Sequence, residues 1–257
     1  MSAADDRCSL FTPDTSAALQ AGLAQARGAA LRAGASRESL QAAETNAWAA
    51  VRRVDCASPD IQTAAQRVRT AFAGFAKLSR LTYPGDLAGW RADRVMSQQA
   101  RWRLMQDAAF GPDRMTFGLA GRDAPGVLLA VARFADGAQP YTARLLMRDT
   151  DRSYGPYLDR RGTAGQLPLA RRLPPRAGLK AYTAEARSVA GQDLLPKDAK
   201  AGWAFRFPAA AVRDLARLDP REAIMVEFLF QDEVVRSAYV EVGDFAAGQA
   251  FVQVAQR

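Results

Sequence analysis

The spacing of apolar residues changes near residue 100, and this change constrains the fold more than any other feature of the sequence. Up to that point apolar side chains recur every three or four residues, which is the repeat of an amphipathic helix. Beyond it they alternate with polar side chains, as in a strand with one buried face. We therefore expect an α+β protein, with an α-helical region at residues 1–98 and an antiparallel β domain at residues 99–257.

Helix-start and helix-stop signals predict an antiparallel helical hairpin followed by a third helix. Thr12-Pro13-Asp14 supplies an N-cap, a first-turn proline and an acid that favours the helix dipole. That helix should end before Gly34, and a second one should run from Ser36 to about residue 55. A third start is Ser58-Pro59-Asp60. The expected seam between the first two helices is mostly alanine and buries little area, as at Ala43, Ala47 and Ala50.

The two cysteines fall at the open end of the expected hairpin. Cys8 lies just before its first helix and Cys56 just after its second, so their side chains can meet in a disulfide. The simpler interpretation is two unrelated buried thiols. A disulfide would place the protein in an oxidising compartment.

The N-terminus and the amino-acid usage favour a bacterial periplasm. Ser2-Ala3-Ala4 before Asp5-Asp6 resembles the tail of a signal-peptide cleavage site, with the signal replaced by Met1. An ordinary polar start of a cytosolic protein would look the same. Arginine outnumbers lysine by 31 to 4, and with heavy alanine use this indicates a GC-rich source. No run of apolar residues is long enough for a transmembrane segment.

About eight strands are expected in the β domain, which predicts an antiparallel β-sandwich or an open barrel. The first four are joined by short turns and should form a meander. Short helices are expected at 209–218 and 244–255. The expected strands are 101–108, 115–120, 127–134, 141–148, 180–188, 203–207, 223–230 and 234–242.

The formal net charge of +8 is concentrated in two zones. Residues 61–103 carry a net +6 and residues 148–180 a net +5, which leaves −3 for the remainder. Arginine offers a planar fork of donors that suits phosphate and carboxylate groups, so these zones could bind an anion or a partner. Ordinary surface charge is the simpler interpretation. The candidate binding residues are Arg91, Arg94, Arg101, Arg103, Arg160, Arg161, Arg171, Arg172 and Arg176.

The sequence contains no histidine, which removes many kinds of catalytic and metal site. Ser-His-Asp and Cys-His hydrolases and His-ligated zinc centres are excluded. Ser-x-x-Lys, Gly-x-Ser-x-Gly and phosphate-binding glycine patterns are also missing, so we expect neither an enzyme nor a cofactor. Carboxylates remain as the one route to acid–base chemistry. However, strand alternation predicts a solvated face for Glu185, Glu227 and Glu241, paired there with Arg187 or Arg236.

Three functions fit these observations. The first is a non-enzymatic protein of the cell envelope that binds through its basic surfaces another envelope protein or an anionic envelope component, and not nucleic acid. The second is a β-sandwich or barrel that holds a small ligand. The third is a carboxylate-dependent hydrolase of an envelope polymer. The residues that could line the ligand pocket of the second are Trp203, Phe205, Phe207, Phe228 and Phe230.

Overall fold

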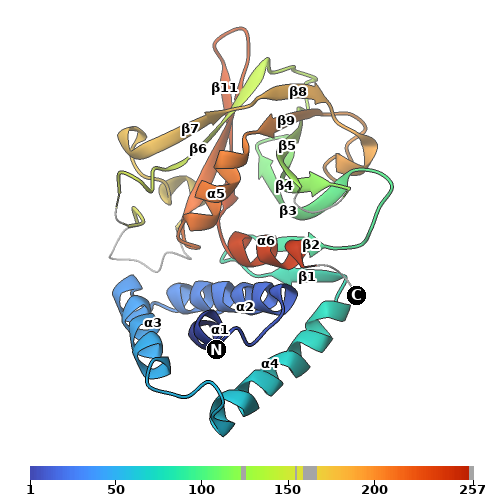
Figure 1. Ribbon diagram of the computed structural model, residues 1–257. Coiled ribbons are helices and arrows are strands. Elements are labelled where there is room, and N and C mark those ends of the chain that lie inside the picture. Colours follow the sequence, from blue (N-terminus) through green and yellow to red (C-terminus); the bar gives the residue numbers. More distant parts are fainter. Residues whose placement is uncertain (123–125, 154, 159–166, 255–257) are drawn as a thin grey trace.

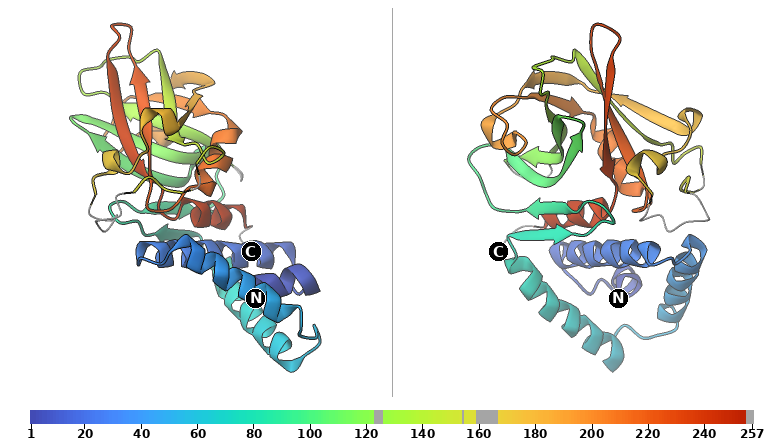
Figure 2. Two further views of the ribbon diagram at one scale, coloured as in Figure 1. Left: turned by 90° about the vertical axis from the view of Figure 1, so that its left-hand side faces the viewer. Right: turned by 180° about the vertical axis from the view of Figure 1, so that it is seen from behind.

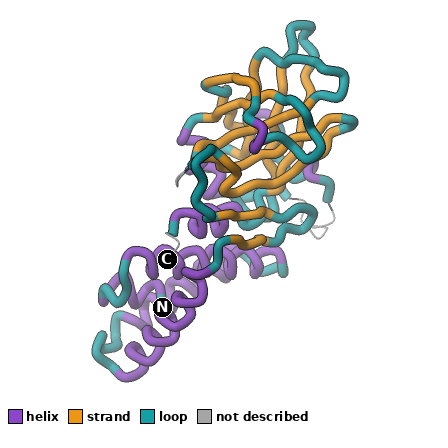
Figure 3. The backbone as a smooth tube through the Cα atoms, turned by 90° about the vertical axis from the view of Figure 1, so that its right-hand side faces the viewer, coloured by secondary structure: helices purple, strands orange, loops and turns teal. Residues whose placement is uncertain are grey.

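A computed structural model describes residues 1–122, 126–153, 155–158 and 167–254 (Figure 1). The expected α+β class is confirmed, with the N-terminal helices gathered at one end of the molecule and the strands, with two short helices, at the other (Figure 3). Two of the candidate binding residues, Arg160 and Arg161, lie outside the described residues.

The N-terminal helices form what we call the helical arm. The N-caps at Thr12, Ser36 and Ser58 are confirmed, since each side chain accepts an N–H from the first turn of its helix. The Cys8–Cys56 disulfide is also confirmed, with 5.8 Å between the Cα atoms. The helices of the arm are α1 (Ser2–Cys8), α2 (Pro13–Arg32), α3 (Arg37–Val51) and α4 (Pro59–Lys77).

Within the arm, α2, α3 and α4 form an open triangular frame, with α1 inside it (Figures 1 and 2). The expected alanine seam is wrong for α3: none of its residues is buried. Helix α1, which was not predicted, takes the place of that seam. Its Arg7 donates to the carbonyls of Val51 and Val54 at the end of α3, beside the disulfide. An alanine seam buries too little area to force two helices together.

The β domain consists of two antiparallel sheets. The seven-stranded sheet has the order β1-β2-β3-β4-β5-β9-β8 and the four-stranded sheet the order β11-β10-β6-β7. The strands are β1 (Arg80–Tyr83), β2 (Trp90–Asp93), β3 (Arg101–Phe110), β4 (Asp113–Gly121), β5 (Val127–Arg133), β6 (Thr142–Arg148), β7 (Leu179–Thr183), β8 (Ala186–Val189), β9 (Trp203–Phe207), β10 (Ala223–Leu229) and β11 (Val235–Glu241).

Three features of the sheets differ from the expected meander. Strand β6 does not extend β3-β4-β5 but pairs with β10 and β7 in the other sheet. The strand expected at 180–188 is divided into β7 and β8, so that the chain passes there from one sheet to the other. Strands β1 and β2 were not predicted, and they lie inside the range expected to be helical. Turn residues do not show which strands pair, and a strand of four residues is too short for its alternation of apolar and polar side chains to be recognised in the sequence.

One buried side chain bridges the two sheets on the side opposite the β7–β8 crossing. The amide oxygen of Gln106 on β3 accepts from the backbone N–H of Glu241 on β11 at 2.8 Å. Its amide nitrogen donates to the carbonyl of Glu241 at 3.2 Å. The glutamine thus replaces one step of a strand ladder where β3 and β11 approach each other.

Two short helices accompany the sheets, α5 (Ala209–Arg217) and α6 (Phe245–Gln253). Helix α6 lies between the β domain and the arm (Figure 1). Its Phe245 ring contacts Trp90 on β2 with centroids 5.0 Å apart, and its Phe251 contacts Phe75 on α4 at 5.3 Å. The arm and the β domain therefore share α6 as a common packing element. In the described parts of the chain, no helix combines the length and apolarity needed to cross a membrane.

Candidate functional site

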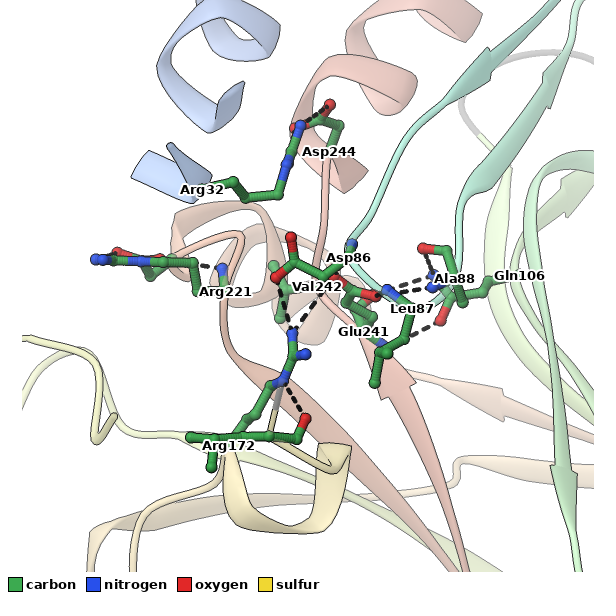
Figure 4. Close-up of polar contacts among 12 residues, drawn as sticks. Arg32, Asp86, Leu87, Ala88, Gln106, Arg172, Arg221, Glu241, Val242 and Asp244 are labelled. Carbon is green, nitrogen blue, oxygen red and sulfur yellow. Dashed lines mark hydrogen bonds and ion pairs between the residues drawn. The ribbon is translucent and has the colours of Figure 1, made fainter. Parts of the chain in front are cut away.

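A layer of paired charges lies where the β domain meets the helical arm, and Figure 4 shows its central part. We call it the charge layer. Every carboxylate in it contacts at least one arginine. Its acids are Asp86, Asp219, Glu222, Glu241 and Asp244, and its bases are Arg32, Arg37, Arg148, Arg172 and Arg221.

Glu241, at the end of β11, is the most enclosed acid of the charge layer. Its carboxylate accepts three successive backbone N–H groups, from Asp86, Leu87 and Ala88, at 2.6, 2.8 and 2.9 Å. Successive N–H groups of this kind form a nest for an anion. The expected solvated face for Glu241 is therefore wrong. The alternation along β11 correctly predicts that the Glu241 side chain points away from the apolar face of the sheet. The opposite face is not solvated, however, because the loop after β1 covers it.

Arg172 is fully buried beside Glu241, so it presents no surface to a partner. Its Nη1 lies 3.1 Å from the Asp86 carboxylate and 3.5 Å from that of Glu241. Its Nε donates to the carbonyl of Leu167 at 2.9 Å. This corrects the expectation of a binding role: an arginine from the second basic zone pairs with the buried Glu241 and with Asp86 on the covering loop.

A second pair in the charge layer, Arg148 and Glu222, is also buried. Two nearly parallel hydrogen bonds of 2.5 and 3.0 Å join the guanidinium to the carboxylate. Glu222 accepts in addition the backbone N–H of Asp219 at 2.8 Å. Burial raises the pKa of Asp219, but the hydrogen bonds and charge of Arg221, with the charge of Arg37, outweigh it and hold that pKa below its usual value. Asp219 is thus an ionised partner rather than a proton donor.

One ion pair of the charge layer ties the arm to the β domain across 212 residues of sequence. Arg32, at the end of α2, donates to both oxygens of Asp244 at 2.7 and 2.9 Å. The hydrogen bonds that Arg32 donates to Asp244 raise the pKa of Arg32. Asp244 occupies the N-cap position of α6, but its side chain makes no capping bond and is committed to Arg32. Gly28 permits this approach, because a Cβ there would lie 2.2 Å from the Asp244 carboxylate.

Two predicted binding residues of the first basic zone are buried structural residues. Arg94 donates to the carbonyls of Phe75, Leu78 and Val254, and its guanidinium lies 3.9 Å from the centre of the Phe251 ring. Arg103 donates to the carbonyls of Val95 and Gly121 at 2.6 and 3.2 Å. Residue type and local charge do not distinguish such arginines from exposed ones.

The two candidate arginines of the first zone that are not buried, Arg91 and Arg101, line a surface groove of about 510 Å³, which we call the arginine groove. The structure brings Arg91 on β2 and Arg101 on β3 together there, and it adds Arg80 on β1, which the sequence analysis did not single out. The Trp102 side chain also lines the groove. The unpredicted strands β1 and β2 place these cations side by side, because residues 80 and 91 come from one antiparallel hairpin.

The cations of the arginine groove are only weakly committed to internal partners. Arg80 pairs with Asp93 at 2.9 Å and Arg91 with Asp107 at 2.6 Å, and their side chains remain 66% and 54% exposed. Exposed pairs of this kind contribute little stability and exchange readily for other anions. Within the described part of the chain, Arg101 forms no ion pair.

Two further candidates, Arg171 and Arg176, are exposed on the segment that leads into β7. The side chain of Arg176 is 90% exposed and lies 3.9 Å from Glu227. Glu227 itself is buried and pairs with Arg144 at 2.7 Å, so the solvated face expected for it is also wrong. Only Glu185 has the expected exposure, and it pairs with Arg206 on β9.

The aromatic residues expected around a ligand pocket pack in the apolar core between the sheets. Phe205 contacts Phe228 with ring centroids 5.4 Å apart, and Phe230 contacts Phe134 at 5.3 Å. Trp203 lies at the edge of the core, where the Arg187 guanidinium stacks 3.6 Å from its centroid.

Comparison with protein-family models, with curated proteins and with solved structures gave no match for this chain. The interpretation of its function therefore depends on the geometry of its own residues.

Proposed function

We propose that the protein is a non-enzymatic interaction protein of the bacterial cell envelope that binds an anionic envelope component. The observation that carries this proposal is the arginine groove, where Arg80, Arg91 and Arg101 converge beside Trp102. It brings together on one surface Arg91 and the partly exposed Arg101, while the buried arginines of both zones serve the fold.

The chemistry of the groove suits a phosphate-bearing or carboxylate-bearing ligand. Guanidinium groups bind such anions through paired hydrogen bonds. A ligand anion can replace Asp93 and Asp107 at little cost because those pairs are exposed. Among the residues that the structure describes, Arg101 forms no ion pair that a ligand anion would have to replace.

The disulfide supports the assignment to an oxidising compartment, and for a bacterial chain that compartment is the periplasm. The anions available there are lipid headgroups, lipopolysaccharide phosphates and acidic glycans. The charge layer supports a non-enzymatic role, because its carboxylates are neutralised by arginines rather than held ready to exchange protons.

Co-sedimentation with vesicles and with purified lipopolysaccharide tests this proposal. We expect binding to lipopolysaccharide or phosphatidylglycerol vesicles but not to phosphatidylcholine vesicles, weakening as salt rises. The double variant Arg91→Ala, Arg101→Ala should lose binding about tenfold or more, since two cations are removed. Arg213→Ala, an exposed arginine on α5, is the matched control and should bind normally. Salt-insensitive binding, or equal binding by both variants, would overturn the proposal.

A further inference from the structure

A second cleft lies between the helical arm and the β domain, lined in part by residues of the charge layer. Helices α2 and α3 contribute its lining from the arm, and the end of α5 and the start of α6 from the β domain (Figure 1). We call it the joint cleft. Its volume is about 400 Å³. Small-molecule sites measure about 300–1,000 Å³ and often lie where two regions of a protein meet, so the joint cleft has the size and the place of such a site.

Most of the lining of the joint cleft is apolar. Apart from its charged residues and Gln20, it consists of leucine, alanine, valine, proline and glycine residues. The leucines come from both sides, with Leu23 and Leu31 on α2 and Leu215 and Leu218 at the end of α5. A ligand that fills this space therefore needs an apolar body.

The acids of the joint cleft are already neutralised by arginines. Among the described residues that line it, three are acids, and each pairs with an arginine other than Arg37. Arg217, which also lines the cleft, pairs with two acids outside it, Asp151 and Asp214. The pairs of the lining acids are Asp219–Arg221, Asp244–Arg32 and Glu44–Arg27, with closest N–O distances of 2.9, 2.7 and 3.3 Å.

Arg37, at the start of α3, is thus the surplus cation of the joint cleft. Its Nε donates to Asp219 at 3.1 Å, but both oxygens of that carboxylate already accept from Arg221. Within the described part of the chain, the two Nη groups of Arg37 form no hydrogen bond. The side chain is 31% exposed, so solvent reaches it. A guanidinium held by its Nε edge keeps its paired Nη donors for the two oxygens of a carboxylate.

We propose that the joint cleft binds a small amphipathic monocarboxylate. The single surplus charge specifies a monoanion, the paired Nη donors of Arg37 specify its carboxylate, and the leucines of α2 and α5 hold its apolar body. The joint cleft shares no residue with the arginine groove, so this site and the proposed function are tested separately.

Isothermal titration calorimetry with the whole protein tests the ligand class. The probes are decanoate, its neutral counterpart decan-1-ol, and the shorter hexanoate. Decanoate should bind at least about tenfold more tightly than decan-1-ol, because only the carboxylate can pair with Arg37. It should also bind at least about tenfold more tightly than hexanoate, because four further methylene groups are buried.

Arg37→Gln tests the carboxylate contact, and Arg52→Gln is its matched control. Arg52 is an exposed arginine at the other end of α3 and does not line the joint cleft. Arg37→Gln should fold, since Asp219 keeps Arg221. It should weaken decanoate binding about tenfold or more and remove the preference over decan-1-ol, while Arg52→Gln binds normally.

Ala216→Phe tests the place of binding, and Ala42→Phe is its matched control. Ala216 on α5 lines the joint cleft and is partly exposed, whereas Ala42 is exposed on α3 outside it. Circular dichroism checks the fold of each. The added ring at 216 should fill the cleft and weaken decanoate binding about tenfold or more, and the ring at 42 should leave it unchanged.

The double variant Arg91→Ala, Arg101→Ala separates this site from the arginine groove and should bind decanoate normally. Loss of decanoate binding in that variant would place the ligand in the arginine groove and overturn the proposal. The absence of decanoate binding to the native protein, or equal binding of decanoate and decan-1-ol, would also overturn it. So would equal affinity within either matched pair of variants.

Discussion

The helical arm and the β domain are built on different physical principles although one chain forms both. The buried residues of the arm are nearly all small, with Leu31 the one large apolar side chain among those of its described helices. The β domain instead buries whole aromatic rings, such as Phe117, Phe205 and Phe228. The hydrophobic effect scales with buried apolar area, so it stabilises the β domain far more than the arm.

The arm makes up for its thin core with specific connections. A disulfide closes its far end, Arg94 ties α4 to α6, and the Arg32–Asp244 pair joins α2 to α6. No residue of α3 is buried, and α2 and α4 each keep one face outside the core. The difference shows that large apolar side chains of the arm, such as Leu23 and Trp48, stay partly exposed, whereas most of those in the β domain are buried in its core.

The largest expected effect is a difference in stability between core substitutions in the two regions. Phe228→Ala should lower the free energy of unfolding by about 4 kcal/mol, because this fully buried ring contacts Phe110, Phe134 and Phe205. Phe72→Ala on α4 of the arm should cost much less, since Phe72 is only partly buried. Urea unfolding of both variants checks this. Equal losses would contradict the contrast between the regions.

Removal of the disulfide should act on the arm alone. The double variant Cys8→Ser, Cys56→Ser loses a cross-link that spans 48 residues, and the arm should lose about 3 kcal/mol of local stability. Limited proteolysis should then cut α3 and α4 rapidly and leave a stable β fragment. Simultaneous digestion of both regions would show instead that they unfold as one unit.

Loss of one ion pair should loosen the joint between the regions. Arg32→Ala leaves the carboxylate of Asp244 buried without its partner, which should cost about 2 kcal/mol. The double variant Arg32→Ala, Asp244→Ala should recover part of that loss, because no charge then stays buried unpaired. A double variant as unstable as the sum of the two single variants would contradict this coupling.

Acid should weaken the same joint through Asp219, which pairs with Arg37 at the start of α3 in the arm. Its pKa is lowered in the folded state, so its contribution is present above the unfolded pKa of about 4 and is lost as pH falls through the folded value. A carboxyl group titrates between about pH 6 and pH 3. Over this range the free energy of unfolding of Asp219→Asn should fall less steeply than that of the native protein. Parallel curves would argue against a role for this carboxylate.

The smallest expected effect concerns the surface. Arg101→Ala should change the free energy of unfolding by less than about 0.5 kcal/mol, because this arginine forms no ion pair within the part of the chain that the structure describes. Its effect should appear in anion binding instead. A marked loss of stability would show that Arg101 serves the fold, as Arg94 and Arg103 do.

Features encoded by neighbouring residues could be predicted from the sequence, and features that need distant parts of the chain could not. The caps at Thr12, Ser36 and Ser58 and the disulfide follow from local signals and spacing. Most strands follow from alternation. The sheet to which β6 belongs depends on β10, almost eighty residues further along the chain, and alternation carries no information about partners.

The candidate site shows the same division. Charge counting located the zone that contains Arg91 and Arg101, but it also selected Arg94, Arg103 and Arg172, which are buried. The buried arginines differ from the other two because a loop or helix covers them, as α6 covers Arg94. Long-range packing decides this, and a single sequence gives no direct sign of it.

Hydrogen exchange, read by mass spectrometry in oxidised and in reduced protein, tests the contrast between arm and β domain most directly. We predict that reduction of Cys8–Cys56 removes protection from the backbone N–H groups of α1, α3 and α4, while β4, β5 and β10 keep theirs. Protection lost equally in both regions, or retained in both, would contradict the claim that a staple and ion pairs hold the arm while an apolar core holds the β domain.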